Sequence, residues 1–206
     1  MQNTILEQGT HFLREIDADW AQLIQQVGAC QLQFKVEREP YEALVRAVAY
    51  QQLSTKVGDV ILKRFITHFN QQFPTPQQLL DAEFNALRMC GFSGRKIETL
   101  KGIAQGALDG LVPNRAQADE MADDVLISQL IELKGIGRWT VEMMLIFTLE
   151  RQDILPVDDF GVREGYKRLK RLAVAPTPKA LASIGEAWKP YRTVASWYLW
   201  RAPKSV

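Results

Sequence analysis

The sequence has few cysteines, no long apolar run and almost no net charge, and each shortage excludes a class of protein. Its two cysteines, Cys30 and Cys90, have no CxxC partner and no nearby histidine pair, so we expect no zinc site, iron–sulfur cluster or disulfide framework. No apolar run approaches the ~20 residues of a membrane span, and the first residues lack the pattern of a secretory signal. We therefore expect reduced thiols and no membrane partner.

Charge is balanced overall but uneven along the chain. The formal net charge is only +1, whereas nucleic-acid-binding domains usually carry a clear basic excess. Residues 151–206 contain eleven Lys or Arg against five Asp or Glu, and residues 101–150 contain four against eight. This basic end is typical of a solvated face as well as of a binding surface.

Nearly every segment has helical rather than alternating apolar periodicity, and no hairpin signal between strands is present, so we expect an all-α fold. The length allows one core or two small lobes that share a cleft. Polar caps or prolines predict helix starts at Pro40, Ser54 or Thr55, Thr75–Pro76, Ser93, and Asp123 or Asp124. The expected buried faces are Val57, Ile61, Phe65 and Phe69 in one helix and Val125, Leu130, Ile131 and Leu133 in another, with irregular connections at 111–119 and 152–157.

Two glycines join a helix that ends near Leu133 to a second apolar helix. The segment LKGIGRWT contains Gly135 and Gly137, which allow backbone conformations closed to other residues and close approach to a ligand. Amides at the start of the second helix lack intrahelical acceptors and lie at its positive end, so a phosphate is a natural partner. In the alternative reading, Gly135 simply ends a helix and Gly137 permits tight packing.

A downstream motif favours the phosphate reading. The arrangement LxGIGxxT, an apolar helix, then LPVDDFG at residues 155–161 resembles the helix–hairpin–helix DNA glycosylase superfamily. Through GIGRWT, PVDD and WKPYR, residues 40–202 are similar to the 3-methyladenine DNA glycosylase II, or AlkA, type. The resemblance implies an enzyme that hydrolyses alkylated purines from DNA, in a compact form without an N-terminal β-domain.

Within this resemblance the catalytic carboxylate is Asp159, with Asp158 as second choice; we assign Asp158 the cap of the following helix. Bifunctional relatives carry a lysine two residues beyond the second hairpin glycine, where this chain has Trp139. Without an amine there, a monofunctional, water-using mechanism is favoured.

Aromatic side chains are candidates for the base pocket, because a purine methylated on a ring nitrogen is cationic and attracts a π-face. Trp139 occupies the hairpin, and Trp200 matches a second stacking position in the family, although core packing is an equal alternative for it. Trp20, Trp188 and Trp197 are expected in the core. The predicted pocket residues are Trp139, Trp200, Tyr50 and Phe160.

The target base must leave the duplex, so a side chain is needed to fill the gap. By resemblance, Gln51 and Gln52 lie in the plugging loop and Gln52 at the wedge itself; an exposed helix end is the alternative. The predicted DNA-binding residues are Gln51, Gln52, Lys134, Gly135, Ile136, Gly137, Arg138 and Thr140.

The expected organisation is a single domain, 1–206, with a central lobe at 40–155 and a terminal lobe at 1–39 plus 156–206 flanking a DNA-binding and base-binding cleft. The resemblance adds a monovalent cation, Na⁺ or K⁺, on the carbonyls of Ile131, Leu133 and Ile136, and no required cofactor. We expect a monomer that acts on double-stranded DNA, cytoplasmic and nucleoid-associated in a bacterium or nuclear in a eukaryote. Alternatives are a bifunctional glycosylase/lyase, a non-catalytic DNA-binding module, and a helical interaction protein.

Overall fold

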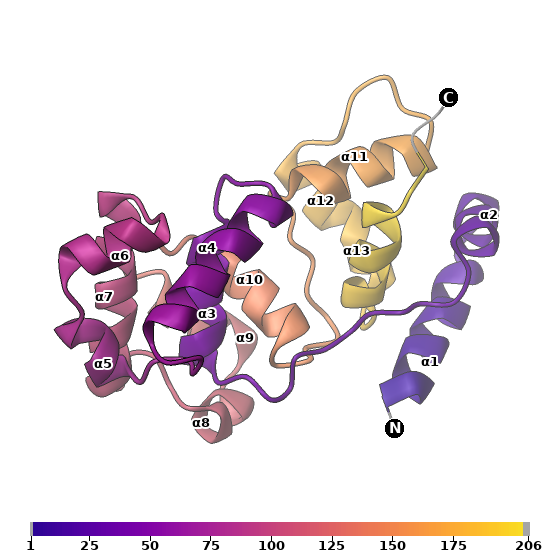
Figure 1. Ribbon diagram of the computed structural model, residues 1–206. Coiled ribbons are helices and arrows are strands. Elements are labelled where there is room, and N and C mark those ends of the chain that lie inside the picture. The colour runs from indigo at the N-terminus through magenta and orange to yellow at the C-terminus, as the bar shows by residue number, and fades with distance from the viewer. Residues whose placement is uncertain (1, 204–206) are drawn as a thin grey trace. The chain divides into compact units, whose positions relative to one another are not determined.

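The apolar spacing of the sequence produces helices throughout residues 2–203, the part that this computed structural model describes (Figure 1). No strand occurs among these residues, so the all-α prediction is confirmed. They form two units, one comprising Lys35–Leu149 and the other residues 2–34 with 150–203; the divisions fall at 34/35 and 149/150 rather than at 39/40 and 155/156. None of the described helices combines the length and apolar character that crossing a bilayer requires.

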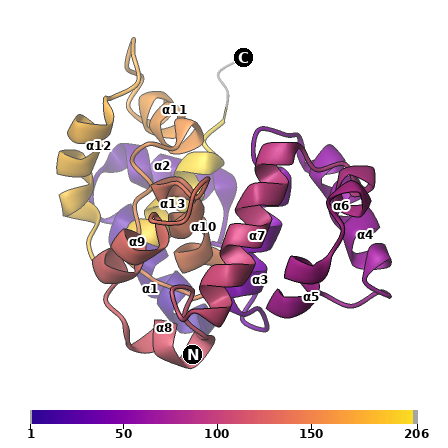
Figure 2. The ribbon, with the colours of Figure 1, turned by 90° about the vertical axis from the view of Figure 1, so that its left-hand side faces the viewer.

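In the Lys35–Leu149 unit, α3 packs against α4, α7 and α10, and Figure 2 shows α7 running beside α3. Phe65 is fully buried and meets Phe69, Phe73 and Phe92 at steep angles, an arrangement that aromatic rings favour. The helices of this unit are α3 (Pro40–Tyr50), α4 (Thr55–His68), α5 (Pro76–Asp81), α6 (Phe84–Cys90), α7 (Gly94–Leu108), α8 (Arg115–Glu120), α9 (Asp123–Leu130) and α10 (Arg138–Phe147).

In the other unit, α11 and α13 lie in direct backbone contact. A Cβ on Gly165 would come within 2.0 Å of the Leu199 carbonyl oxygen, so only glycine allows this approach. Trp20, Trp188 and Trp197 are buried as predicted, and the first two meet edge to face at 5.4 Å. The elements are α1 (Gln2–Arg14), α2 (Ala18–Val27), α11 (Phe160–Leu169), α12 (Pro178–Ile184), the 3₁₀ helix η1 (Gly185–Trp188) and α13 (Arg192–Trp200).

Most predicted helix starts are confirmed. Pro40 opens α3, Thr75 caps α5 through a capping box, and the hydroxyl of Ser93 accepts from an amide of α7. The predicted cap at Asp123 or Asp124 is wrong, because α9 starts after Ala122 without a side-chain cap. The two aspartates instead occupy the first turn, where their charge favours the helix dipole.

Two predicted buried faces were partly wrong. Val57 is exposed although Ile61 and Phe65 of the same helix are buried. On α9 the buried stripe is Leu126, Ile127 and Leu130, whereas Val125 and Ile131 are exposed, because α9 ends at Leu130 and turns a different side inward. The 111–119 connection also contains the start of α8, which is capped by Asn114.

Candidate active site and DNA interface

The hairpin between α9 and α10 depends on a glycine at one position for two reasons. Gly135 has a φ of 89°, in the left-handed region, and a Cβ there would lie 2.1 Å from Oγ1 of Thr99 on α7. Leu133 and Ile136 on either side are buried, and the Ile136 amide donates to the Leu133 carbonyl at 3.0 Å. These contacts fix the turn against the body of its unit.

Gly137 is different, because packing does not require it. It is the N-cap of α10 with an ordinary φ of −98°, and among residues 2–203 a Cβ there would meet no heavy atom within 4 Å. The tight-packing alternative therefore does not explain this glycine. An open backbone before the first amides of a helix suits the approach of an anion.

The basic residues of the hairpin both have acidic partners. Lys134 lies 3.1 Å from Glu98, and Arg138 lies 2.9 Å from the buried Glu142. Thr140, also predicted to bind DNA, has only 3% of its surface exposed. The residue is buried, its amide donates to the Gly137 carbonyl at 2.9 Å and its hydroxyl lies beside Gln51, so Thr140 supports the hairpin from within and its DNA contact stays a prediction.

The loop after α3 is tied to the hairpin. Nε2 of Gln51 donates to the Gly135 carbonyl at 3.2 Å and lies 3.4 Å from Oγ1 of Thr140. Gln52 is exposed and has a φ of 57°, which is rare for a residue with a side chain. The loop therefore presents Gln52 outward while Gln51 anchors it.

Tyr50 faces α4. Its ring lies where a Cβ of Gly58 would be, and its hydroxyl donates to Asp59 at 2.6 Å. Burial, followed by the hydrogen bond and charge of Asp59, raises the pKa of this phenol. These contacts hold the ring against α4, which limits its freedom as a wall of a base pocket.

Sequence reasoning missed two residues of α7 that support this surface. Lys96 donates to backbone carbonyls at the end of α3, and Thr99 packs against Gly135. The only sequence signal was their position in the first two turns of a well-capped helix, since contacts with distant segments do not follow from local spacing.

One predicted role within the aspartate pair, the cap of α11 by Asp158, is wrong. Asp159, not Asp158, is the N-cap of α11: its Oδ1 accepts from the Val162 amide at 2.8 Å. The same oxygen accepts from Nε1 of Trp200 at 2.9 Å, whereas Asp158 is exposed. The carboxylate of Asp159 is thus oriented by a helix start and by an indole.

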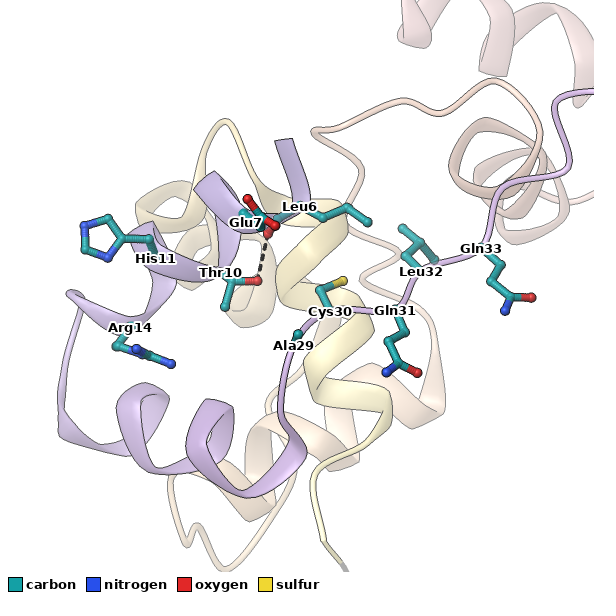
Figure 3. Close-up of a pocket in the computed structure, with 10 residues that line it drawn as sticks. All are labelled: Leu6, Glu7, Thr10, His11, Arg14, Ala29, Cys30, Gln31, Leu32 and Gln33. Atoms are coloured by element: carbon teal, nitrogen blue, oxygen red, sulfur yellow. Dashed lines mark hydrogen bonds between the residues drawn. The ribbon is translucent and has the colours of Figure 1, made fainter. Parts of the chain in front are cut away.

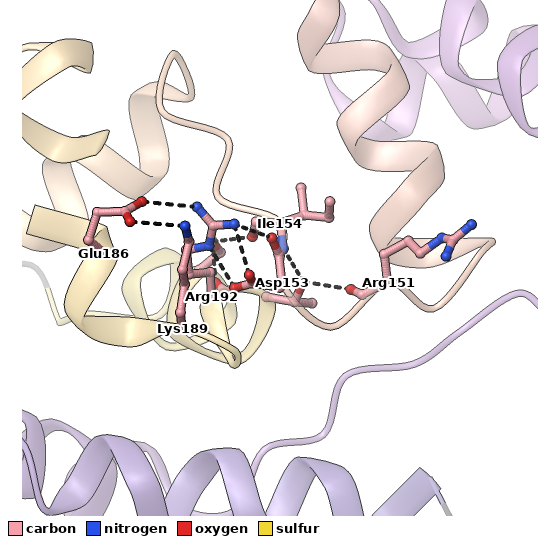
Figure 4. A network of polar contacts seen from close by, with 8 residues as sticks. Arg151, Asp153, Ile154, Glu186, Lys189 and Arg192 are labelled. Atoms are coloured by element: carbon pink, nitrogen blue, oxygen red, sulfur yellow. Dashed lines mark hydrogen bonds and ion pairs between the residues drawn. The ribbon is translucent and has the colours of Figure 1, made fainter. Parts of the chain in front are cut away.

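The chain leading to Asp159 is fastened along the start of α13. Arg192 binds the carboxylate of Asp153 through two nitrogens at 2.6 and 2.9 Å, and Figure 4 shows it between Asp153 and Glu186. The buried Thr193 hydroxyl donates to the Arg151 carbonyl and accepts from the Ile154 amide. Because α13 also ends at Trp200, one helix holds both the approach to Asp159 and the carboxylate itself.

The predicted aromatic pocket residues differ in exposure. Trp139, in the first turn of α10, is 41% exposed, and Phe160, in the first turn of α11, is 74% exposed. Trp200 is half-buried and its ring approaches Gly161, where a Cβ would lie 2.9 Å from it. Trp139 and Tyr50 belong to the Lys35–Leu149 unit, and Asp159, Phe160 and Trp200 to the other.

The side chains of the described residues do not meet the requirements of a metal site. Among residues 2–203 no group of three or more His, Cys, Asp or Glu side chains is placed to bind one. Of the three carbonyls proposed for a monovalent cation, that of Leu133 already accepts the Ile136 amide, and a carbonyl has a second lone pair to offer. The cation on Ile131, Leu133 and Ile136 stays a prediction.

A hollow of about 520 Å³ lies between α1 and residues 29–33 (Figure 3), and it contains none of the predicted site residues. Cys30 lines it, and burial raises the pKa of its thiol to about 11. Cys90 is buried and Cys30 is half-buried, and both are free cysteines. A thiol with a raised pKa is mostly protonated near neutral pH and is a poor nucleophile.

Comparison with known proteins identifies a family and close relatives. A family model described as "HhH-GPD superfamily base excision DNA repair protein" matches residues 45–190. DNA-3-methyladenine glycosylase 1 of Schizosaccharomyces pombe is 44% identical over 98% of this chain and 89% of its own length. The alkylbase DNA glycosidase-like protein mag2 of the same organism is 37% identical over 93% of this chain and 91% of its own.

Two solved structures resemble this chain in both fold and sequence. The S. pombe 3-methyladenine DNA glycosylase Mag1 in complex with abasic DNA has a TM-score of 0.89 and 43% identity, covering 94% of this chain and 95% of that one. The DNA-3-methyladenine glycosidase of Bacillus halodurans has a TM-score of 0.83 and 34% identity, covering 94% and 88%. From its hairpin, its aspartate pair and these matches, the chain belongs to the HhH-GPD superfamily of base excision DNA repair proteins.

Proposed function

We propose that this protein is a monofunctional DNA glycosylase that hydrolyses the N-glycosidic bond of alkylated purines, of the 3-methyladenine and 7-methylguanine class, and leaves an abasic site. The observation that carries the proposal is the Asp159 carboxylate, held by the Val162 amide and the Trp200 indole. It is supported by relatives named 3-methyladenine glycosylases and by the similarity to one bound to abasic DNA.

The role we assign to Asp159 is to stabilise the positive charge that develops on the sugar. As the bond between C1′ and the base nitrogen breaks, its electron pair leaves with the base and positive charge develops on the sugar, as in glycoside hydrolysis. A fixed carboxylate stabilises that charge and accepts a proton from the water that adds at C1′. A base alkylated at N3 or N7 is already cationic and departs neutral, so the chain needs no strong general acid.

Trp139 supports the monofunctional assignment. A lyase step requires an amine that attacks C1′ and forms a Schiff base, and the position at which bifunctional relatives carry that lysine is a tryptophan here. The half-exposed indole instead offers a face to a cationic purine. Borohydride reduction of a reaction mixture is therefore expected to trap no protein–DNA adduct; a trapped adduct would favour the bifunctional alternative.

Base extrusion belongs to the loop after α3 and to exposed aromatic groups. Gln52 is exposed in this loop, at a positive φ, and is the proposed wedge. Trp139, Phe160 and Trp200 are the proposed contacts of the flipped base, and the open backbone at Gly137 the proposed phosphate contact. In this proposal the protein acts as a monomer on double-stranded DNA. It needs no cofactor, and a monovalent cation binds at the hairpin. Its place is the cytoplasm of a bacterium or the nucleus of a eukaryote.

The test compares two neighbouring aspartates. Asp159→Asn and Asp158→Asn remove the same charge one residue apart, and only the first carboxylate is held by the Trp200 indole. We expect Asp159→Asn to lose release of 3-methyladenine and 7-methylguanine from methylated DNA by about a hundredfold or more, while Asp158→Asn keeps most of it. Both variants should still bind abasic DNA. A fully active Asp159→Asn would remove the proposed catalytic residue, and binding without base release by the wild type would favour a non-catalytic module.

A further inference from the structure

The first turns of α7 contact both segments that the proposed function assigns to DNA. Lys96 reaches the loop after α3, Glu98 lies 3.1 Å from Lys134 of the hairpin, and Thr99 packs against Gly135. These three residues fall within four consecutive positions of one helix. One rigid element therefore supports the wedge loop and the hairpin together.

Lys96 has an unusual set of partners. Its Nζ donates to the carbonyl of Ala49 at 3.2 Å and to that of Gln51 at 3.0 Å, and no carboxylate in the described part of the chain forms an ion pair with it. Carbonyls at the C-terminal end of a helix lack intrahelical donors and carry partial negative charge. Lys96 thus satisfies the end of α3 at the residue directly before Gln52.

The loop is also fixed from its other side. The side chain of Gln51 donates to the Gly135 carbonyl while its own carbonyl accepts from Lys96. Gln51 therefore links Lys96 to the hairpin, and Thr99, one turn further along α7, limits where Gly135 lies. Burial lowers the pKa of Lys96, consistent with an ammonium group withdrawn from water to make these bonds.

We propose that Lys96 is a positioning residue that holds the Gln51–Gln52 loop in register with the hairpin, so that the wedge enters DNA where the hairpin grips it. Lys96 acts on base extrusion, through the loop, and not on bond cleavage. This inference rests on the proposed function, in particular on Gln52 as the wedge.

The same helix provides a matched control. Lys101 also donates to two backbone carbonyls, those of Leu80 and Ala82, at 3.0 and 2.9 Å, but these lie at the end of α5 and away from the loop. Lys96→Met and Lys101→Met each remove one ammonium and two hydrogen bonds from α7. If Lys96 were only structural, the two variants would behave alike.

For each variant we would measure base release in single turnover, affinity for abasic DNA and stability in urea. A fourth measurement, the fluorescence of 2-aminopurine placed beside an abasic site, reports insertion of the wedge. We expect Lys96→Met to slow release of 7-methylguanine by about tenfold or more, with affinity changed by less than about threefold. The 2-aminopurine signal should fall as in Gln52→Ala, and adding Gln52→Ala to Lys96→Met should cost little further. Lys96→Arg should restore most of the rate, and Lys101→Met should lose stability without these effects.

Equal rate losses in the two lysine variants, or a loss in Lys96→Met explained by weaker DNA binding alone, would overturn the proposal. An unchanged 2-aminopurine signal in Gln52→Ala would instead remove Gln52 as the wedge, and Lys96 as its positioning residue with it. The activity of Asp159→Asn is measured separately. Its loss would support the glycosylase assignment whatever the Lys96 and Gln52 variants show, so the two proposals can fail independently.

Discussion

At the scale of single residues, one oxygen of Asp159 accepts two hydrogen bonds, from the Val162 amide and from Trp200. The first bond also caps α11, so the same oxygen that starts the helix sets the direction of the carboxylate. Gly161 keeps the space beside it open, because a Cβ there would lie 2.9 Å from the Trp200 ring and 3.1 Å from Asp159. The orientation of the proposed catalytic group thus depends on an indole more than thirty residues away.

Trp200→Phe tests that dependence, since it keeps an aromatic ring and removes the Nε1 donor. We expect the single-turnover rate to fall about ten- to hundredfold, as loss of a hydrogen bond to a carboxylate costs about 1.5–3 kcal/mol. In the Asp159→Asn background the same substitution should have a much smaller effect, because its partner charge is gone. Equal losses in both backgrounds would mean that Trp200 acts on the base alone.

The two hairpin glycines provide a second comparison. Gly135→Ala places a side chain at positive φ and against Thr99, so we expect the free energy of unfolding to fall by about 2 kcal/mol or more. Gly137→Ala should cost less than about 0.5 kcal/mol, because the site is open and its φ ordinary. Its affinity for abasic DNA should nevertheless fall. Urea melts and fluorescence anisotropy measure both; unchanged affinity in Gly137→Ala would exclude a phosphate at this backbone.

Sequence predicted which residue types form the site better than it predicted their local roles. The pair Asp158–Asp159 and the tryptophan at 139 were evident from the motif alone. Which aspartate caps α11 was not, because either can precede a helix by propensity. In the structure the capping carboxylate is the one bound by Trp200, and that bond is made with a segment distant in sequence.

At the scale of elements, helix starts with a hydroxyl or a proline were predictable, as for Thr75 and Ser93, because the cap bonds to its own helix. The support that Lys96 and Thr99 give to the loop and hairpin was not, since these bonds join different elements. Asp17 combines both cases. Its side chain caps α2 by accepting from the amides of Asp19 and Trp20, and it also accepts a hydrogen bond at 2.6 Å from Lys170, the residue after α11.

Asp17→Asn keeps a capping oxygen but removes the charge opposite Lys170. Burial acts to raise the pKa of Asp17, yet the hydrogen bond from Lys170 and those from the amides leave it below 3.8. A lowered carboxylate pKa stabilises the fold above 3.8, and that stability is lost as the pH falls through the folded-state value. We expect Asp17→Asn to be less stable by about 1 kcal/mol at neutral pH, with the difference from wild type shrinking toward about pH 2.5. A constant difference in urea melts across this range would show that charge is not the cause.

At the scale of the whole molecule, a net charge of +1 is not typical of a DNA-binding protein, and the same balance of charge is found locally at the hairpin. Both basic side chains of the hairpin are paired with acids, Lys134 with Glu98 and Arg138 with Glu142. The family was recognisable from the joint spacing of its motifs along the sequence, of which the hairpin lies in one unit and the aspartate pair in the other. Paired lysines and arginines limit non-specific attraction to phosphates.

Glu98→Gln tests this restraint. The Lys134–Glu98 pair is exposed, at 88% and 59%, so removing one charge should leave stability within about 0.5 kcal/mol. It releases Lys134 to meet a phosphate, so we expect affinity for undamaged duplex to rise about two- to fivefold at low salt. The slope of log affinity against log salt should steepen by up to about 0.9, the value for one added phosphate contact. Lys134→Met should shift both quantities in the opposite direction. If neither variant changes the slope, Lys134 does not face the DNA backbone, and the hairpin binds phosphate through its amides alone.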